Sequence, residues 1–143
     1  MKKMKKTKRK SKRGIRLIVI LAFVAMLLLS GCTRGGMYVV LMGKVDVQDE
    51  EISGSYQYFN GNFFRTLELD EGNTINIDFS HITQKGSISI KVFDKDGEEI
   101  LSISESEENI QLPINEEGEY TIKAVGSKHK GKFEVDWTIK EDE

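Results

Sequence analysis

The sequence predicts an all-β fold, an antiparallel β-sandwich of seven to eight short strands behind a helical N-terminal leader. Apolar and polar residues alternate with a period of two along most of the chain, and turn-forming residues interrupt this alternation at short intervals. No ten-residue window after the leader has the apolar stripe of an amphipathic helix. Strict alternation buries one face of a strand and leaves the other in water, which is typical of antiparallel sheets.

The expected strands begin with Met37–Met42, a compact apolar run whose β-branched residues favour a strand over a helix. Thr33–Gly36 before it is predicted to be a flexible spacer. Four later segments alternate clearly, and each should bury one face. The predicted buried faces are Ile75, Ile77 and Phe79; Ile88, Ile90 and Val92; Tyr120, Ile122 and Ala124; and Phe133, Val135, Trp137 and Ile139.

Turn chemistry separates these strands at Asn60-Gly61, Asp70–Asn73, Asp94–Gly97 and Glu116–Gly118. The carboxylates of Asp94–Gly97 suggest calcium, but the EF-hand spacing is not completed, so a hairpin turn is the favoured interpretation. Glu116–Tyr120 resembles a tyrosine corner, in which the phenol bonds back to nearby backbone at a sandwich edge.

The leader carries the most specific signal in the chain. Residues 1–16 hold ten Lys/Arg and no acid, and Leu17–Leu29 is an apolar run of 13 residues. Leu29-Ser30-Gly31-Cys32 follows and resembles the lipobox of bacterial lipoprotein precursors. The resemblance implies that residues 1–31 are a signal peptide cleaved between Gly31 and Cys32. It also implies a diacylglycerol on Cys32 that anchors the protein to the outer face of the cell membrane.

A retained transmembrane helix is the alternative for the leader. A span needs about 20 apolar residues, whereas the segment from Leu17 to Thr33 offers at most 17 before Arg34. We therefore expect residues 32–52 to be the lipidated N-terminus, tether and possible first strand, and residues 53–143 to form the sandwich.

Charge and cysteine content exclude several functions. Without the leader the chain has 11 Lys/Arg against 23 Asp/Glu, a net charge of −12, so nucleic acid is not an expected partner. Cys32 is the only cysteine, which excludes an intramolecular disulfide or a cysteine metal site. His81 and His129 fall in expected loops without metal-pair spacing, and no nucleophile or phosphate-binding motif occurs. We expect no enzymatic activity, no metal and no cofactor beyond the lipid.

Five aromatic residues surround Asn60-Gly61-Asn62 and are the candidate ligand patch. They are either core residues of a hairpin or an exposed contact surface for an envelope protein or glycan. Alternation with a period of two puts Phe59 on the face opposite Tyr56 and Tyr58. It likewise puts Phe63 and Phe64 on opposite faces, so at least some rings should face outward. The five residues are Tyr56, Tyr58, Phe59, Phe63 and Phe64.

A second candidate surface is a basic hairpin tip on the acidic domain. It is either a solvated tip or a contact for anionic headgroups or wall polymer. Its residues are Lys123, Lys128, His129, Lys130 and Lys132.

Two segments, Gly86–Ile100 and Gly118–Gly126, are similar to bacterial pre-peptidase C-terminal domains and the related GOLD-type sandwiches. The closing Gly131–Ile139 resembles the small single-domain lipoproteins of Gram-positive bacteria. These resemblances imply an accessory module with a non-catalytic binding role in the cell envelope. The alternatives are recognition of glycan or wall polymer through the 56–64 aromatics, and an accessory or inhibitory subunit of a membrane complex.

Cys32→Ser tests the anchor, because a hydroxyl at neutral pH does not accept the diacylglycerol as a thiolate does. We expect the variant to stay uncleaved at the Gly31–Cys32 bond and to incorporate no labelled fatty acid. Normal labelling and membrane retention in this variant would contradict the lipoprotein prediction.

Overall fold

The computed structural model describes residues 34–141, which form seven antiparallel strands and no helix. The all-β antiparallel prediction is confirmed. No helix in this part of the chain is long and apolar enough to cross a bilayer. The predicted signal peptide and Cys32 lie outside the described residues. The strands are β1 (Arg34–Leu41), β2 (Lys44–Val47), β3 (Glu51–Leu69), β4 (Thr74–Phe93), β5 (Glu99–Ile103), β6 (Glu107–Pro113) and β7 (Gly118–Lys140).

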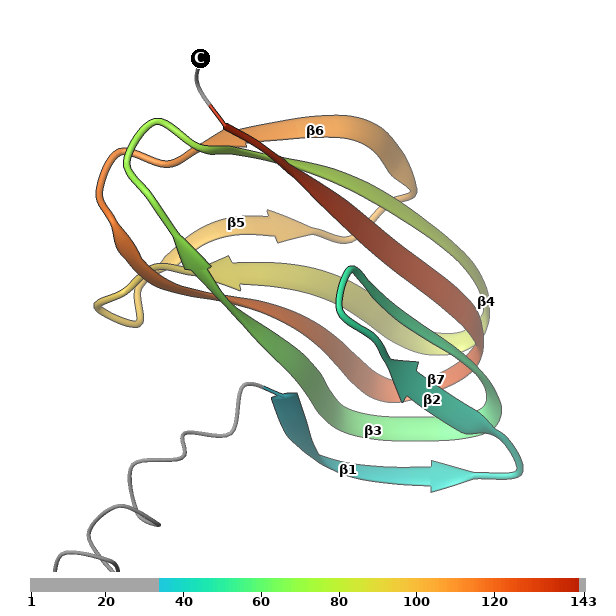
Figure 1. Ribbon diagram of the computed structural model, residues 1–143. Helices are drawn as coiled ribbons and strands as arrows, with labels where there is room; N and C mark the ends of the chain where they lie inside the picture. The colour runs from blue at the N-terminus through green and yellow to red at the C-terminus, as the bar shows by residue number, and fades with distance from the viewer. Residues whose placement is uncertain (1–33, 142–143) are drawn as a thin grey trace, which may run out of the picture. The chain divides into compact units, whose positions relative to one another are not determined.

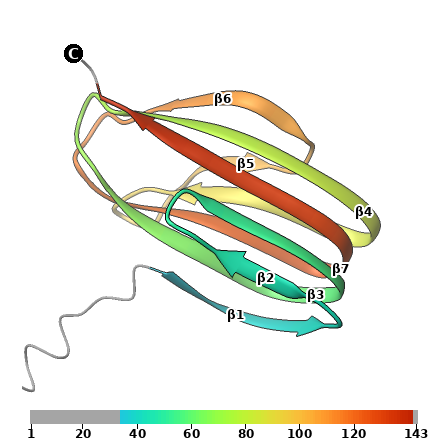
Figure 2. The ribbon, with the colours of Figure 1, turned by 45° about the vertical axis from the view of Figure 1, so that its right-hand side comes forward.

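A single sheet folds over on itself to make both layers of the domain. Three long strands, β3, β7 and β4, run side by side through both layers (Figures 1 and 2). In one layer, one half of each of these three strands lies between β1 and β5, in the order β1-β3-β7-β4-β5. We call this the β1–β5 layer. In the other region β2 pairs with β3 and β6 with β4, which makes the β2–β6 layer.

The long strands change layer at bends that coincide with shifts of register. β3 shifts between Tyr56 and Gly61 against β7, and β4 shifts between Thr83 and Ser87. Gly61, Gly86 and Gly131 have φ angles of 127°, 73° and 144°, a region that glycine enters without the cost of a Cβ. At such bulges the backbone turns sharply while the neighbouring ladder continues.

These bends correct the predicted strand lengths. Asn60-Gly61 is not a hairpin turn but part of β3, and the segments 74–79 and 87–93 are two halves of β4. The segments 119–125 and 132–139 are likewise two halves of β7, so the predicted basic hairpin tip is a bend within one strand. A glycine between two alternating segments can make a turn or a bulge, and local sequence does not separate the two.

The core lies between the layers and uses the faces that the alternation predicts. All predicted inward residues of 75–79, 88–92 and 120–124 are buried, and Trp137 is only 1% exposed. Ile139 is 42% exposed, so its prediction was wrong. It lies beyond Asp136, where the pairing of β7 with β3 ends, so β3 does not flank it.

Three predicted turns are confirmed. Gly97 N–H bonds to the Asp94 carbonyl at 3.0 Å, and the Asp94 carboxylate accepts two further backbone N–H groups of the hairpin. Asn73 N–H bonds to the Asp70 carbonyl. The Tyr120 hydroxyl donates to the Glu116 carbonyl at 2.8 Å, which is the geometry of a tyrosine corner.

The predicted spacer is largely absent. Arg34, Gly35 and Gly36 pair in register with Arg65, Phe64 and Phe63, so they belong to β1 rather than to a flexible linker. The expected strand at 37–42 is confirmed as the rest of β1 up to Leu41; Met42, with a φ of 51°, lies in the following turn. The sheet therefore starts only two residues after Cys32.

Trp137→Ala tests the core assignment. Removing a buried ring of this size costs about 3–5 kcal/mol, a large part of the stability of a small domain. We expect the native protein to emit at the short wavelength of a buried indole and the variant to unfold at much lower urea. Emission typical of a water-exposed indole in the folded protein would show that this face of β7 is inverted.

Candidate binding surface

The five candidate aromatics separate into a buried and a partly exposed group. Tyr56, Phe59 and Phe63 are 3%, 0% and 6% exposed and belong to the core, which corrects their assignment to an accessible patch. The bulge after Tyr56 inserts an additional residue, so Tyr56 and Phe59 both point inward although they are three residues apart. Tyr58 and Phe64 are partly exposed on the outer face, and Phe63 and Phe64 face opposite ways as predicted.

The two outer rings do not form one stacking platform. Tyr58 and Phe64 are six residues apart on β3, which is about 20 Å along an extended strand. On β1, Leu41 lies opposite Tyr58 and Gly35 lies opposite Phe64. The outer rings therefore mark the two ends of a surface that β1 and β3 make together.

β1 carries most of the exposed apolar surface and was not predicted as a site. Met37, Val39 and Leu41 are 81%, 52% and 55% exposed. They alternate on the outer face, continuous with Tyr58 and Phe64, and we call these five residues the outer strip. Tyr38 and Met42 are also exposed, so five of the eight large exposed hydrophobics among the described residues lie at 37–42. The signal was an apolar run that directly follows the predicted anchor.

The core-facing side of β1 is only partly buried. Tyr38 is on the core-facing row, its ring 4.0 Å from that of buried Phe63, yet it is 53% exposed. Gly36 lies opposite Phe63, and a Cβ there would collide with the Asn62 carbonyl oxygen. Val40 packs against the core from the same row. Within residues 34–141 β1 pairs with β3 alone, so none of the described strands pairs with its other backbone edge.

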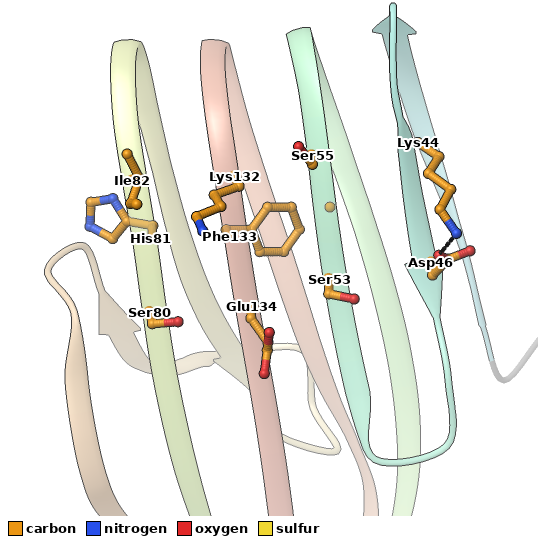
Figure 3. A pocket seen from close by; sticks show the side chains of 11 residues that line it. Lys44, Asp46, Ser53, Ser55, Ser80, His81, Ile82, Lys132, Phe133 and Glu134 are labelled. Carbon is orange, nitrogen blue, oxygen red and sulfur yellow. Dashed lines mark ion pairs between the residues drawn. The ribbon is translucent and has the colours of Figure 1, made fainter.

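A groove of about 470 Å³ crosses the outer face of the β2–β6 layer (Figure 3). We call it the polar groove for its serine, lysine and carboxylate side chains, although apolar atoms make up more of its lining surface. Its strands β4, β7, β3 and β2 lie side by side, and Figure 3 shows Ser80, Glu134 and Ser53 in one row across them. Lys44 and Asp46 form an ion pair of 2.6 Å at one margin. The groove offers hydroxyls and charged groups, with Ile82 at the other margin.

Carboxylates gather beside this groove. Burial raises the pKa of Asp136, and the nearby carboxylates of Asp78, Glu134 and Glu51 raise it further. The outer face of the β2–β6 layer therefore carries a cluster of negative charge.

The two histidines lie in strands, not in the expected loops, and the bends bring them together. His129 is fully buried on β7; its Nδ1 bonds to the Tyr56 hydroxyl and its Nε2 to the Thr83 hydroxyl, each at 2.8 Å. Thr83 also bonds to His81 Nδ1 at 2.9 Å. Burial lowers the pKa of His129, and the neighbouring His81 lowers it further. Burial likewise raises the pKa of Tyr56.

This chain of hydrogen bonds joins β3, β7 and β4 where they change layer. Both ring nitrogens of His129 are satisfied by hydroxyls, which makes the neutral ring a structural link. No group of three His, Cys, Asp or Glu in residues 34–141 is arranged to hold a metal ion.

The sequence matches no protein family and no curated protein. Three solved structures have a partly similar fold. Aeromonas hydrophila PliG, a periplasmic lysozyme inhibitor of g-type lysozyme, is 12% identical, with a TM-score of 0.46 over 77% of this chain and 89% of that one. The enzymatically active domain of bacteriophage CBA120 tailspike protein 4 is 15% identical (TM-score 0.46), over 76% of this chain and 19% of that one. TmCBM61 in complex with β-1,4-galactotriose is 18% identical (TM-score 0.40), over 75% and 70%. No family is identified.

His129→Gln tests the buried link. Because its pKa is lowered in the folded state, His129 binds protons more readily when unfolded. Its contribution to stability is present above the ordinary histidine pKa of about 6.5. It is lost as the pH falls from there through the folded pKa. We expect the free energy of unfolding to fall less between pH 7 and 5 in the variant than in the native protein.

The raised pKa of Asp136 has the opposite effect, because it makes the free energy of unfolding rise as the pH falls. Asp136 is present in both proteins, so its effect cancels when their pH profiles are compared. Identical pH profiles for His129→Gln and the native domain would contradict a buried neutral His129.

Proposed function

We propose that this protein is a non-catalytic binding protein of the bacterial cell envelope, held at the outer face of the membrane by a diacylglycerol on Cys32. Its partner is a protein that adds an extended segment to the free edge of β1. The observation that carries this proposal is the apolar edge strand β1. Its core-facing side chains Tyr38 and Val40 are only partly covered by the rest of the domain.

An unpaired strand edge presents N–H and C=O groups that can pair with another chain. Globular proteins usually protect such edges with charges, prolines or a covering segment, because exposed apolar edges cause aggregation. From Gly35 to Leu41 β1 has no charge and no proline. A secreted protein that keeps such an edge is explained most simply by a partner that pairs with it, as in binding by strand addition.

The inner row gives the partner segment its chemistry. An added strand would place side chains over Tyr38 and Val40, where they would extend the core around Phe63. Apolar residues at alternate positions of that segment fit this row, while main-chain hydrogen bonds supply the pairing. An accessory or inhibitory subunit of a membrane complex would use such an interface.

Glycan recognition is the second candidate, and the polar groove of the β2–β6 layer is what favours it. Ser53, Ser80 and Glu134 offer hydroxyl and carboxylate groups in one row, which suits a polyhydroxylated ligand. The groove takes the place of the 56–64 aromatics as the candidate glycan site, since three of those rings are in the core.

Photo-crosslinking on intact cells tests the strand-addition proposal. A photoreactive residue at position 38 or 40 should crosslink to one and the same protein, and Val40→Lys should reduce the crosslink from position 38 at least tenfold. Ser102→Lys, which puts the same charge on the edge strand β5 of the same layer, is the matched control and should leave it unchanged.

Equal crosslinking in both lysine variants would contradict binding at β1. Retention on purified wall polymer that Glu134→Gln abolishes and Val40→Lys leaves intact would instead favour the glycan candidate. Thermal unfolding of each variant verifies that the fold is kept.

A further inference from the structure

We propose that the outer face of the β1–β5 layer lies against the bilayer, with the outer strip of β1 and β3 in the headgroup region. The proposal rests on the lipid on Cys32 that the proposed function assigns. It goes beyond that function because it gives the domain one orientation on the membrane.

The chain between the predicted anchor and the sheet is short. A lipid on Cys32 holds that residue at the membrane surface, and Arg34 already pairs with Arg65. Two residues span at most about 7 Å when fully extended. The N-terminal end of β1 is therefore within about 7 Å of the anchored residue, and the domain has no long tether with which to stand away from the bilayer.

The outer strip consists of aliphatic and aromatic side chains. Met37, Val39 and Leu41 project from the outer face along a strand that is about 26 Å long. Tyr58 at one end and Phe64 at the other are partly exposed aromatic rings on the same face. Aromatic and aliphatic side chains are favoured at the boundary between headgroups and acyl chains.

The charge of the domain also constrains its orientation. A domain of net charge −12 is repelled by an anionic bilayer unless its carboxylates point away. The acids Asp136, Glu134 and Asp78 alternate with core residues on the β2–β6 layer, so they lie on its outer face.

The centre of the outer face of the β1–β5 layer has few charged groups. They are Lys123 and Lys91, of which Lys91 is paired with Glu99 on β5 at 2.6 Å. Two further outward carboxylates, Glu68 and Glu119, lie opposite each other at the far ends of β3 and β7 from the bends. Lys123 lies over the Phe93 ring, 4.8 Å from its centroid. The outward side chains concerned are Tyr58, Asn60, Asn62, Phe64 and Thr66 on β3; Ser87, Ser89, Lys91 and Phe93 on β4; and Thr121, Lys123, Val125 and Ser127 on β7.

The orientation has consequences for both candidate sites. A strand added to the free edge of β1 would lie in the plane of the headgroups, so the partner segment would be a juxtamembrane one. The polar groove is on the outer face of the other layer and would point away from the membrane.

Fluorescent labelling of the mature lipoprotein in vesicles tests the orientation. Cys32 is blocked by lipid, so Val39→Cys introduces the only reactive thiol, which is labelled with an environment-sensitive probe. Gln111→Cys is the matched control, because Gln111 is exposed on the edge strand β6 of the other layer. In vesicles of phosphatidylglycerol and phosphatidylethanolamine we expect a blue-shifted probe at position 39, quenched several-fold more by nitroxide lipids than the probe at position 111.

Equal access of aqueous iodide to both probes, in protein that stays with the vesicles, would overturn the orientation and leave the anchor intact. A blue shift that appears only at high protein-to-lipid ratio would also overturn it, in favour of a second copy on β1. Loss of both labelled proteins from the vesicles would instead show that the proposed lipid anchor fails.

Discussion

The bends in β3, β4 and β7 are the constraint on which the rest of this domain depends. Because these strands pass from one layer into the other, a single sheet supplies both faces of the core. Each bend needs a residue that enters unusual φ angles, and at Gly131 a Cβ would collide with the Ile82 carbonyl oxygen. The fold thus depends on a few glycines as much as on its apolar residues.

The same bends explain the buried polar chain. Tyr56, Thr83 and His129 come from three strands and meet where register is lost, and side-chain hydrogen bonds there link the strands. A buried hydrogen-bond network of this kind favours one arrangement of the strands, whereas apolar packing alone tolerates small shifts of register. It also makes stability depend on a neutral His129.

The two faces of the sandwich differ in a way that suits a protein held at a surface. One layer has carboxylates and hydroxyls around a groove, and the other presents an apolar strip along β1 and β3. Three features would together bring one side of the domain to the membrane. They are a short connection to a lipid on Cys32, the unpaired edge of β1 and this asymmetry of the two faces. Function in this protein would then be a matter of orientation and of one open edge.

The sequence by itself determined the fold class, the inward faces of most strands, the three turns and the tyrosine corner, because alternation and turn chemistry are local properties. It also carries the lipobox resemblance at Cys32, which lies outside the described residues. Only the tertiary structure decided that Asn60-Gly61 is a bulge, that Tyr56 and Phe59 are both in the core, and that His81 and His129 share Thr83 as a partner. These features depend on pairing between residues far apart in the chain. The exposure of β1 has the same origin, because an apolar strand is buried or open according to which strands lie beside it.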